Sequence, residues 1–149
     1  MRRFPKVEDL LPHRHTMLLV DTILDVDTSN ALTQATVKSD WPLVTKTQVS
    51  PIVLVELAAQ TAGVCLGWTA MQSDKASAAA PKGWLVGVKR ATFYVDSIAL
   101  GKRIITHTEN KLVADDYKEI SATLTMDQET IAEIQIQVLQ ADKTAFSGV

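Results

Sequence analysis

The sequence predicts an α+β domain in which a curved antiparallel sheet wraps around one long central helix. Three observations lead to this fold class. Residues 51–71 form one apolar run that is too long for a strand. Residues 130–138 alternate apolar and polar side chains with a period of two, as a strand with one wet face does. Further runs rich in β-branched residues lie on both sides of the long apolar run.

The length and composition fit one soluble globular domain. The chain has 149 residues, enough for a substantial core, with 21% charged and 46% hydrophobic residues. The formal charge of -2 and the scattered Lys and Arg residues argue against a nucleic-acid partner. We find no repeat or linker, and we therefore expect a single domain over residues 1–149.

The N-terminus and the cysteine content bear on the compartment and on metals. Arg2 and Arg3 are not followed by the apolar segment of a signal peptide, so we expect a cytoplasmic protein. Cys65 is the only cysteine and, between Val64 and Leu66, is expected to be a small buried side chain. Three dispersed histidines do not make a ligand set, and there is no glycine-rich phosphate loop. We expect no metal and no cofactor.

The apolar run at residues 51–71 is as long as a membrane span, but Glu56, Gln60 and two threonines argue against one. Ser50 can cap the helix, with Pro51 in its first position. The helix is apolar nearly all round, so other elements must enclose it. Its small residues leave room for the backbone of a wrapped sheet or for a second copy of the helix: Ala58, Ala59, Ala62, Gly63 and Gly67.

The remaining runs predict strands. We expect an N-terminal hairpin formed by residues 17–26 and 31–37, with a polar turn between them. After the helix, the pattern predicts strands at residues 83–95, 103–113, 118–126 and 130–138, the last two joined by a short polar turn. The small-residue stretch at 76–82 is expected to be a mobile loop.

Four motifs resemble the 3-hydroxyacyl-(acyl carrier protein) dehydratases, which have the hotdog fold. Residues 10–21, a Leu-Pro-His-Arg turn before an apolar strand ending in Val-Asp, resemble that family's N-terminal signature. Residues 56–60 resemble its Glu-Ala-Met-Ala-Gln helix, and residues 85–93 resemble the strand that follows. Residues 100–102 fall where the family has a Pro-Gly-Asp turn. Within the family, the sequence looks most similar to the branch associated with aryl polyene pigment clusters.

The resemblance covers residues 8–140 and implies a hydro-lyase of fatty acid or polyene biosynthesis. Removing water from a 3-hydroxyacyl thioester needs a base for the C2 proton, an acid for the hydroxyl and donors for the thioester oxygen. In the family, a helix carboxylate and a loop histidine from the two subunits of a dimer supply the first two roles, and N–H groups at the helix N-terminus face the carbonyl. The implied partners are acyl carrier protein or a coenzyme A thioester. The implied assembly is a homodimer or higher homo-oligomer, or a heteromer with another hotdog subunit.

The catalytic residues match this pattern only in part. Glu56 stands at the position of the helix carboxylate, whereas the position of the family's histidine falls at Pro42. Glu56 therefore needs another partner group. The candidates are His13, His15 and Asp40. Both Glu56 and His13 also have a structural interpretation. The acid can lie at a helix end that touches solvent or pair with Arg14 or Arg90, and the histidine can bond to the backbone of its turn.

The resemblance places Gln60, Ser50 and Gly87 in the substrate-binding set. Gln60 can instead bond to neighbouring backbone within a buried helix. The Lys89-Arg90 and Lys102-Arg103 pairs are expected to be solvated strand ends or, alternatively, to attract the acidic surface of a carrier protein.

Three functions remain open at this stage. The first is a dehydratase-like enzyme, which predicts a buried tunnel that ends at Glu56. The second is a catalytically silent hotdog subunit that binds an acyl chain or pairs with an active partner. The third is a hotdog thioesterase in which Glu56 serves as the base without a histidine.

Overall fold

The computed structural model describes residues 3–72 and 82–142. The expected mobile loop at residues 76–82 lies outside these ranges except for its last residue. In chain order the elements are α1 (Val7–Leu10), η1 (His15–Met17), β1 (Thr22–Val26), β2 (Asn30–Thr36), β3 (Val44–Thr45), β4 (Gln48–Val49), α2 (Val53–Gln72), β5 (Lys82–Phe93), β6 (Ile98–Ala99), β7 (Arg103–Ala114), β8 (Tyr117–Met126) and β9 (Glu129–Asp142).

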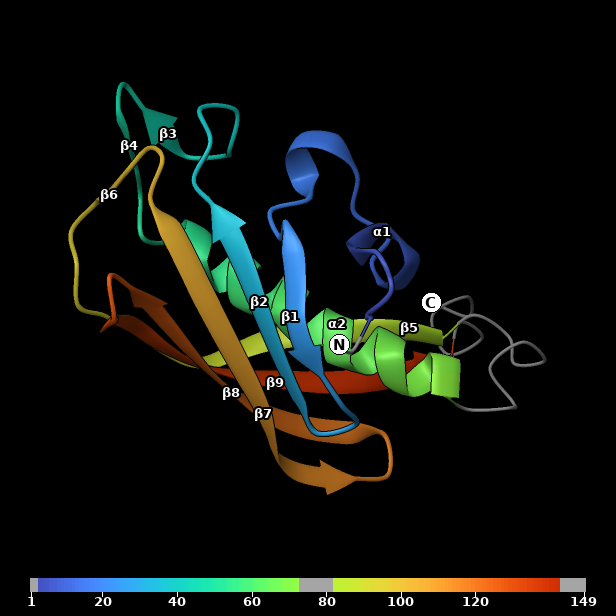
Figure 1. The fold of residues 1–149 in the computed structure, drawn as a ribbon. Coiled ribbons are helices and arrows are strands. Elements are labelled where there is room, and N and C mark those ends of the chain that lie inside the picture. The colour runs from blue at the N-terminus through green and yellow to red at the C-terminus, as the bar shows by residue number, and fades with distance from the viewer. Residues whose placement is uncertain (1–2, 73–81, 143–149) are drawn as a thin grey trace.

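The main sheet has six strands in the order β1-β2-β7-β8-β9-β5, and every neighbouring pair is antiparallel. In Figure 1 the strands bend around α2 from β1 at one edge to β5 at the other. A small sheet of β3, β4 and β6 lies beside the segment that leads into α2. The α+β architecture with a wrapped central helix is therefore confirmed.

The hairpin of β8 and β9 follows the sequence pattern closely. Along β9 the apolar side chains at alternate positions are buried, from Ala132 to Val138, whereas Glu133 and Gln135 between them are exposed. Asp127 and Gln128 both have positive φ, 52° and 69°, as a two-residue hairpin turn of type I′ requires. Both strands run longer than the residue ranges that the sequence predicts.

α2 is enclosed as expected. It is the one helix of the described ranges that is long and apolar enough to cross a membrane, yet 56% of that stretch is buried inside the protein, which fits a core helix. A Cβ atom added at Gly67 would lie 2.7 Å from the carbonyl oxygen of Leu10, and one at Gly63 would lie 2.8 Å from Leu11 Cδ2. Within the chain, the close neighbour of these glycines is therefore the N-terminal segment.

The structure also corrects where two of the predicted elements begin. The strand expected over residues 17–26 pairs with its neighbour only from residue 21 onward, because the Leu19 and Val20 N–H groups bond to the side chain of Gln60 instead. The helix begins at Val53 rather than Pro51, and the N–H groups of its first three residues bond to carbonyl oxygens three residues back. The short elements α1, β3, β4 and β6 were not predicted, since two to four residues are too few to show a period.

Candidate active site

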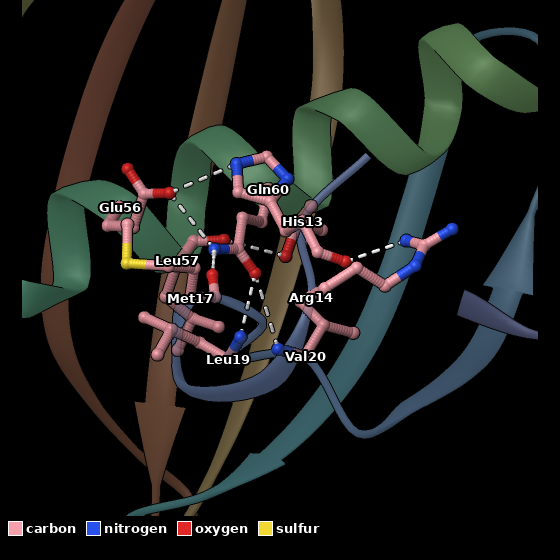
Figure 2. A network of polar contacts seen from close by, with 9 residues as sticks. His13, Arg14, Met17, Leu19, Val20, Glu56, Leu57 and Gln60 are labelled. Carbon is pink, nitrogen blue, oxygen red and sulfur yellow. Dashed lines mark hydrogen bonds and ion pairs between the residues drawn. The ribbon is translucent and has the colours of Figure 1, made fainter. Parts of the chain in front are cut away.

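Glu56 lies in the first turn of α2, and 43% of its side-chain surface is exposed. The carboxylate is therefore at a helix end that touches solvent, as the structural interpretation of this residue expected. It is not isolated, because two side chains contact its Oε1 atom. Figure 2 shows the carboxylate turned toward His13 and Gln60.

His13 is the candidate partner that the fold brings to Glu56. Its Nε2 atom lies 3.4 Å from Glu56 Oε1, within ion-pair distance. Its Nδ1 atom is buried and has no hydrogen-bond partner in the described part of the chain. The edge of the ring that bears Nε2 therefore faces the carboxylate. His13 and Glu56 come from the N-terminal turn and from α2, so one chain supplies both groups.

The other two candidate partners lie apart from this pair. His15 is exposed at the start of η1 and has a positive φ of 56°. Asp40 is exposed in the loop between β2 and β3. Within residues 3–72 and 82–142, no hydrogen bond or ion pair joins either of them to Glu56. Pro42, at the family's histidine position, is also exposed.

Gln60 connects the carboxylate to the N-terminal segment. Its Nε2 group donates to Glu56 Oε1 at 2.9 Å and to the carbonyl oxygen of Met17 at 2.7 Å. Its Oε1 atom accepts the N–H groups of Leu19 at 2.9 Å and Val20 at 3.4 Å. A primary amide offers two donors and about two acceptor positions, and all are used. The structure therefore assigns this residue to holding the site together and leaves no free group for the expected substrate contact.

Arg14 does not pair with Glu56, contrary to one alternative that the sequence left open. Its guanidinium donates instead to the carbonyl oxygens of Leu11, His13 and Glu8, at 2.7, 2.7 and 2.9 Å. The sequence alone did not predict this role. The signal was present in the Leu-Pro-His-Arg turn, which contains His13 and Arg14 side by side.

The N-terminus of α2 differs from the family expectation. The Ile52 N–H bonds to Ser50 Oγ at 3.3 Å, and the N–H groups of the next three residues bond to carbonyl oxygens of residues 50–52. The first amides of the helix are thus occupied within the turn rather than free to face a substrate carbonyl. Ser50 thus accepts an N–H group in the turn before the helix, and the predicted cap with Pro51 as the first helical residue is wrong. The Ser50 hydroxyl still has its own hydrogen to donate.

Gly87, the third residue expected to bind substrate, is exposed on β5 opposite Gln137. No described contact links it to Glu56. Two open hollows of about 640 and 300 Å³ lie elsewhere on the protein, and Glu56 is not in their walls. The acyl tunnel therefore stays a prediction.

The basic pairs are partly neutralised by neighbouring acids. Lys102 Nζ lies 2.9 Å from Asp127 Oδ2, and Lys89 Nζ lies 3.1 Å from Glu119 Oε1. The hydrogen bond from Tyr117 and the charge of Lys89 lower the pKa of Glu119. Half of the four cations expected to attract a carrier protein are thus already engaged.

Cys65 is a small buried side chain, as predicted, with 1% of its surface exposed. Its Sγ atom donates to the carbonyl oxygen of Asp27 at 3.3 Å. Burial raises the pKa of the thiol to about 11, so it is not a reactive nucleophile near neutral pH.

Comparison with solved structures shows the fold. The chain is similar to a chain of the dehydratase heterocomplex ApeI:P from Xenorhabdus doucetiae, with 20% identity, a TM-score of 0.82, and coverage of 98% of this chain and 97% of that one. It is also similar to an HP0420 homologue from Helicobacter felis (14% identity, TM-score 0.70, coverage 96% and 93%). A third match is the sigma28-regulated virulence protein Cj0977 from Campylobacter jejuni (17% identity, TM-score 0.67, coverage 92% and 96%).

These likenesses confirm the hotdog fold. No curated protein matches the chain. The family model of the ApeP dehydratase, however, matches residues 5–147, which is nearly the whole sequence. This chain belongs to the ApeP dehydratase family.

Proposed function

We propose that this protein removes water from a 3-hydroxyacyl thioester, with Glu56 and His13 as its acid–base pair. The observation that carries the proposal is the 3.4 Å contact between His13 Nε2 and Glu56 Oε1. A pair of titratable groups in contact can divide the roles of base and acid between them. The family match supports a dehydratase in particular.

The reaction then proceeds as an elimination across C2 and C3. At the start Nε2 of His13 carries no proton and the carboxyl group of Glu56 carries one. Nε2 takes a proton from C2, the double bond forms, and the C3 hydroxyl leaves as water with the proton of the Glu56 carboxyl group. The pair ends as an imidazolium and a carboxylate. Transfer of the proton from Nε2 to Oε1 across their contact restores the starting state.

The thioester oxygen also needs a donor as charge develops on it. The first amides of α2 are occupied, whereas the hydroxyl hydrogen of Ser50 offers a donor just before the helix start. We assign Ser50 this role. Gln60 keeps Glu56 in place through the 2.9 Å bond from its amide.

Acyl carrier protein is the proposed carrier of the substrate, coenzyme A being the alternative, and the setting is polyene or fatty acid biosynthesis in the cytoplasm. Two exposed apolar side chains support an acyl substrate. Met17 is 60% exposed and Ile52, one turn before Glu56, is 62% exposed. Apolar surface beside a catalytic carboxylate suits the hydrocarbon part of an acyl chain.

The test is to incubate the protein with a 3-hydroxyacyl carrier-protein thioester and to follow loss of water by mass. The proposal predicts an enoyl product. Glu56→Gln should slow its formation by about 10²–10⁴, whereas Glu129→Gln, at an exposed acid at the start of β9, should not. Hydrolysis to free carrier thiol, lost on Glu56→Gln, would point to the thioesterase instead. Equal turnover by the wild type and Glu56→Gln would rule out the proposed site.

A second candidate function is that of a partner subunit in a dehydratase heteromer. The half-exposed Glu56, with Met17 and Ile52 beside it, leaves the site open in the single chain. One similar structure is a dehydratase heterocomplex. In this case the chain alone is inactive, and turnover appears only when a second hotdog chain with its own histidine is added. Activity of the purified chain by itself would exclude this alternative.

A further inference from the structure

We infer that Arg14 is the positioning residue that aims His13 at Glu56. This inference rests on the proposed acid–base pair and adds a residue to it. Arg14 is exposed and contacts no acid in the described ranges, so its charge is not used in an ion pair. All of its described hydrogen bonds go to backbone carbonyl oxygens of the segment that carries His13.

The three acceptor carbonyls show which part of the backbone the guanidinium holds in place. One nitrogen donates to both Leu11 O and His13 O at 2.7 Å, and the other donates to Glu8 O at 2.9 Å. Figure 2 shows the bond to the carbonyl group of His13 itself. Because this carbonyl belongs to the residue that bears the imidazole, the bond fixes the backbone from which the imidazole projects. A planar fork of donors can join several carbonyls at once, whereas the single ammonium of a lysine acts as a point charge.

The N-terminal segment contacts α2 both before and after the residues that Arg14 holds. Before it, Leu10 packs against Gly67 with no room for a Cβ atom between them. After it, Gln60 bonds to the backbone of Met17 and Leu19. Residues 11–16 lie between these two contacts, and the hydrogen bonds of Arg14 connect them to α1.

The ring of His13 has one productive orientation. Its Nδ1 atom is buried and has no hydrogen-bond partner among the described residues, and only Nε2 faces the carboxylate. A small change in the backbone at residue 13 therefore moves the sole useful nitrogen away from Oε1, and there is no second nitrogen on the same side to replace it.

The experiment compares Arg14→Gln and Arg14→Lys with Arg3→Gln, an exposed arginine with no partner in the described part of the chain, which gives the same charge change. We expect Arg14→Gln to lower kcat by roughly tenfold to a hundredfold with little change in KM, because misplaced groups lose rate rather than binding. Arg14→Lys should recover only part of this loss, and Arg3→Gln should match the wild type.

A second readout does not depend on turnover. Long-range ¹H–¹⁵N spectra report the imidazole nitrogens of His13, identified by their loss in His13→Gln. In the wild-type background Glu56→Gln should shift these signals, and in the Arg14→Gln background the same change should leave them nearly unmoved. An Arg14→Gln protein that keeps both its kcat and the response of His13 to Glu56→Gln would overturn the inference.

The two readouts separate the inference from the proposed function. If the protein has no dehydratase activity, the function fails, but the dependence of the His13 signals on Arg14 still supports the positioning role. If dehydration occurs while the His13 signals respond to Glu56→Gln equally in both backgrounds, the function stands and the role of Arg14 is refuted.

Discussion

At the scale of single residues, the amide of Gln60 has each of its hydrogen-bonding positions filled. Its partners are one carboxylate on its own helix and three backbone groups of the N-terminal segment. The side chain is 1% exposed, so water cannot replace these partners. One residue therefore both holds Glu56 and sets where the N-terminal segment ends and β1 begins.

Replacing Gln60 by Leu should destabilise the fold. The change leaves the two buried N–H groups of Leu19 and Val20 without partners, which costs about 2–4 kcal/mol of the free energy of unfolding. Urea denaturation measures this difference. Gln135→Leu, at an exposed position of β9, is the matched control and should change stability by less than about 0.5 kcal/mol. Equal stability of the two variants would show that the network contributes little.

The stability of the fold should depend on the thiol of Cys65 at alkaline pH. Burial raises its pKa from 9.0 to about 11. Because the folded pKa is the higher one, the contribution is complete below pH 9 and is lost as the pH rises toward 11. The loss amounts to at most about 2–3 kcal/mol. The wild type should lose more unfolding free energy over this interval than Cys65→Ala, and parallel curves for the two proteins would contradict the assignment.

The residue scale also shows what the sequence could reveal of the site. Glu56 was found from its motif, since an acid one turn before a glutamine in an apolar helix is unusual. The sequence could not show that His13, rather than His15 or Asp40, is the partner of Glu56. The partner depends on how the N-terminal segment crosses α2. That crossing is set by Gln60 and Arg14 through bonds to backbone atoms, which leave little trace in the sequence pattern.

At the scale of elements, α2 and the N-terminal segment pack through glycine. A Cβ atom at Gly67 would come within 2.7 Å of Leu10 O, which belongs to the backbone and cannot rotate away. At Gly63 the nearest atom is the end of the Leu11 side chain, at 2.8 Å, which can move. The position of α1, and of the turn that follows it, thus depends on Gly67 more than on Gly63.

Gly67→Ala should therefore destabilise the protein although alanine favours helix formation. The propensity gain is about 1 kcal/mol, and the overlap with Leu10 should outweigh it, for a net loss of about 1–2 kcal/mol. Thermal unfolding provides the measurement. Gly63→Ala should cost less, and Gly87→Ala, with no atom closer than 3.9 Å, should be close to neutral. A more stable Gly67→Ala protein would show that α1 packs differently.

Long periodic elements were predictable, and short ones were not. The alternation in β9 and the apolar run of α2 persist over many residues, so the period is clear. The first part of the predicted strand at residues 17–26 has the same apolar character, yet its amides bond to a helix side chain rather than to a strand. A local pattern cannot distinguish these two partners, since both bury the same residues.

At the scale of the whole molecule, β5 is an edge of the main sheet, and its outer side has no partner strand in the described chain. Val86 and Val88 on this strand are 51% and 48% exposed. A long edge strand with exposed apolar residues is a site where another chain can pair. The expected dimer, or a heteromer with another hotdog chain, would use this edge.

The assembly should therefore respond to charge on β5. We expect the purified protein to be at least a dimer by light scattering and the double variant Val86→Lys and Val88→Lys to be a monomer, because two lysines on an edge oppose pairing. The matched control changes Leu112 and Val113 of β7, which are similarly exposed, to Lys and should leave the assembly intact. Dissociation of the control but not of the β5 variant would place the interface elsewhere.

The most direct test of the Glu56–His13 pair is a double-mutant cycle on dehydration of a 3-hydroxyacyl carrier-protein thioester, with His107→Gln as the control at an exposed histidine. If the two groups act as one unit, Glu56→Gln and His13→Gln each lower kcat by about 10²–10⁴, and the double variant is no slower than the slower single variant. Wild-type turnover by His13→Gln, or losses that multiply in the double variant, would contradict the account.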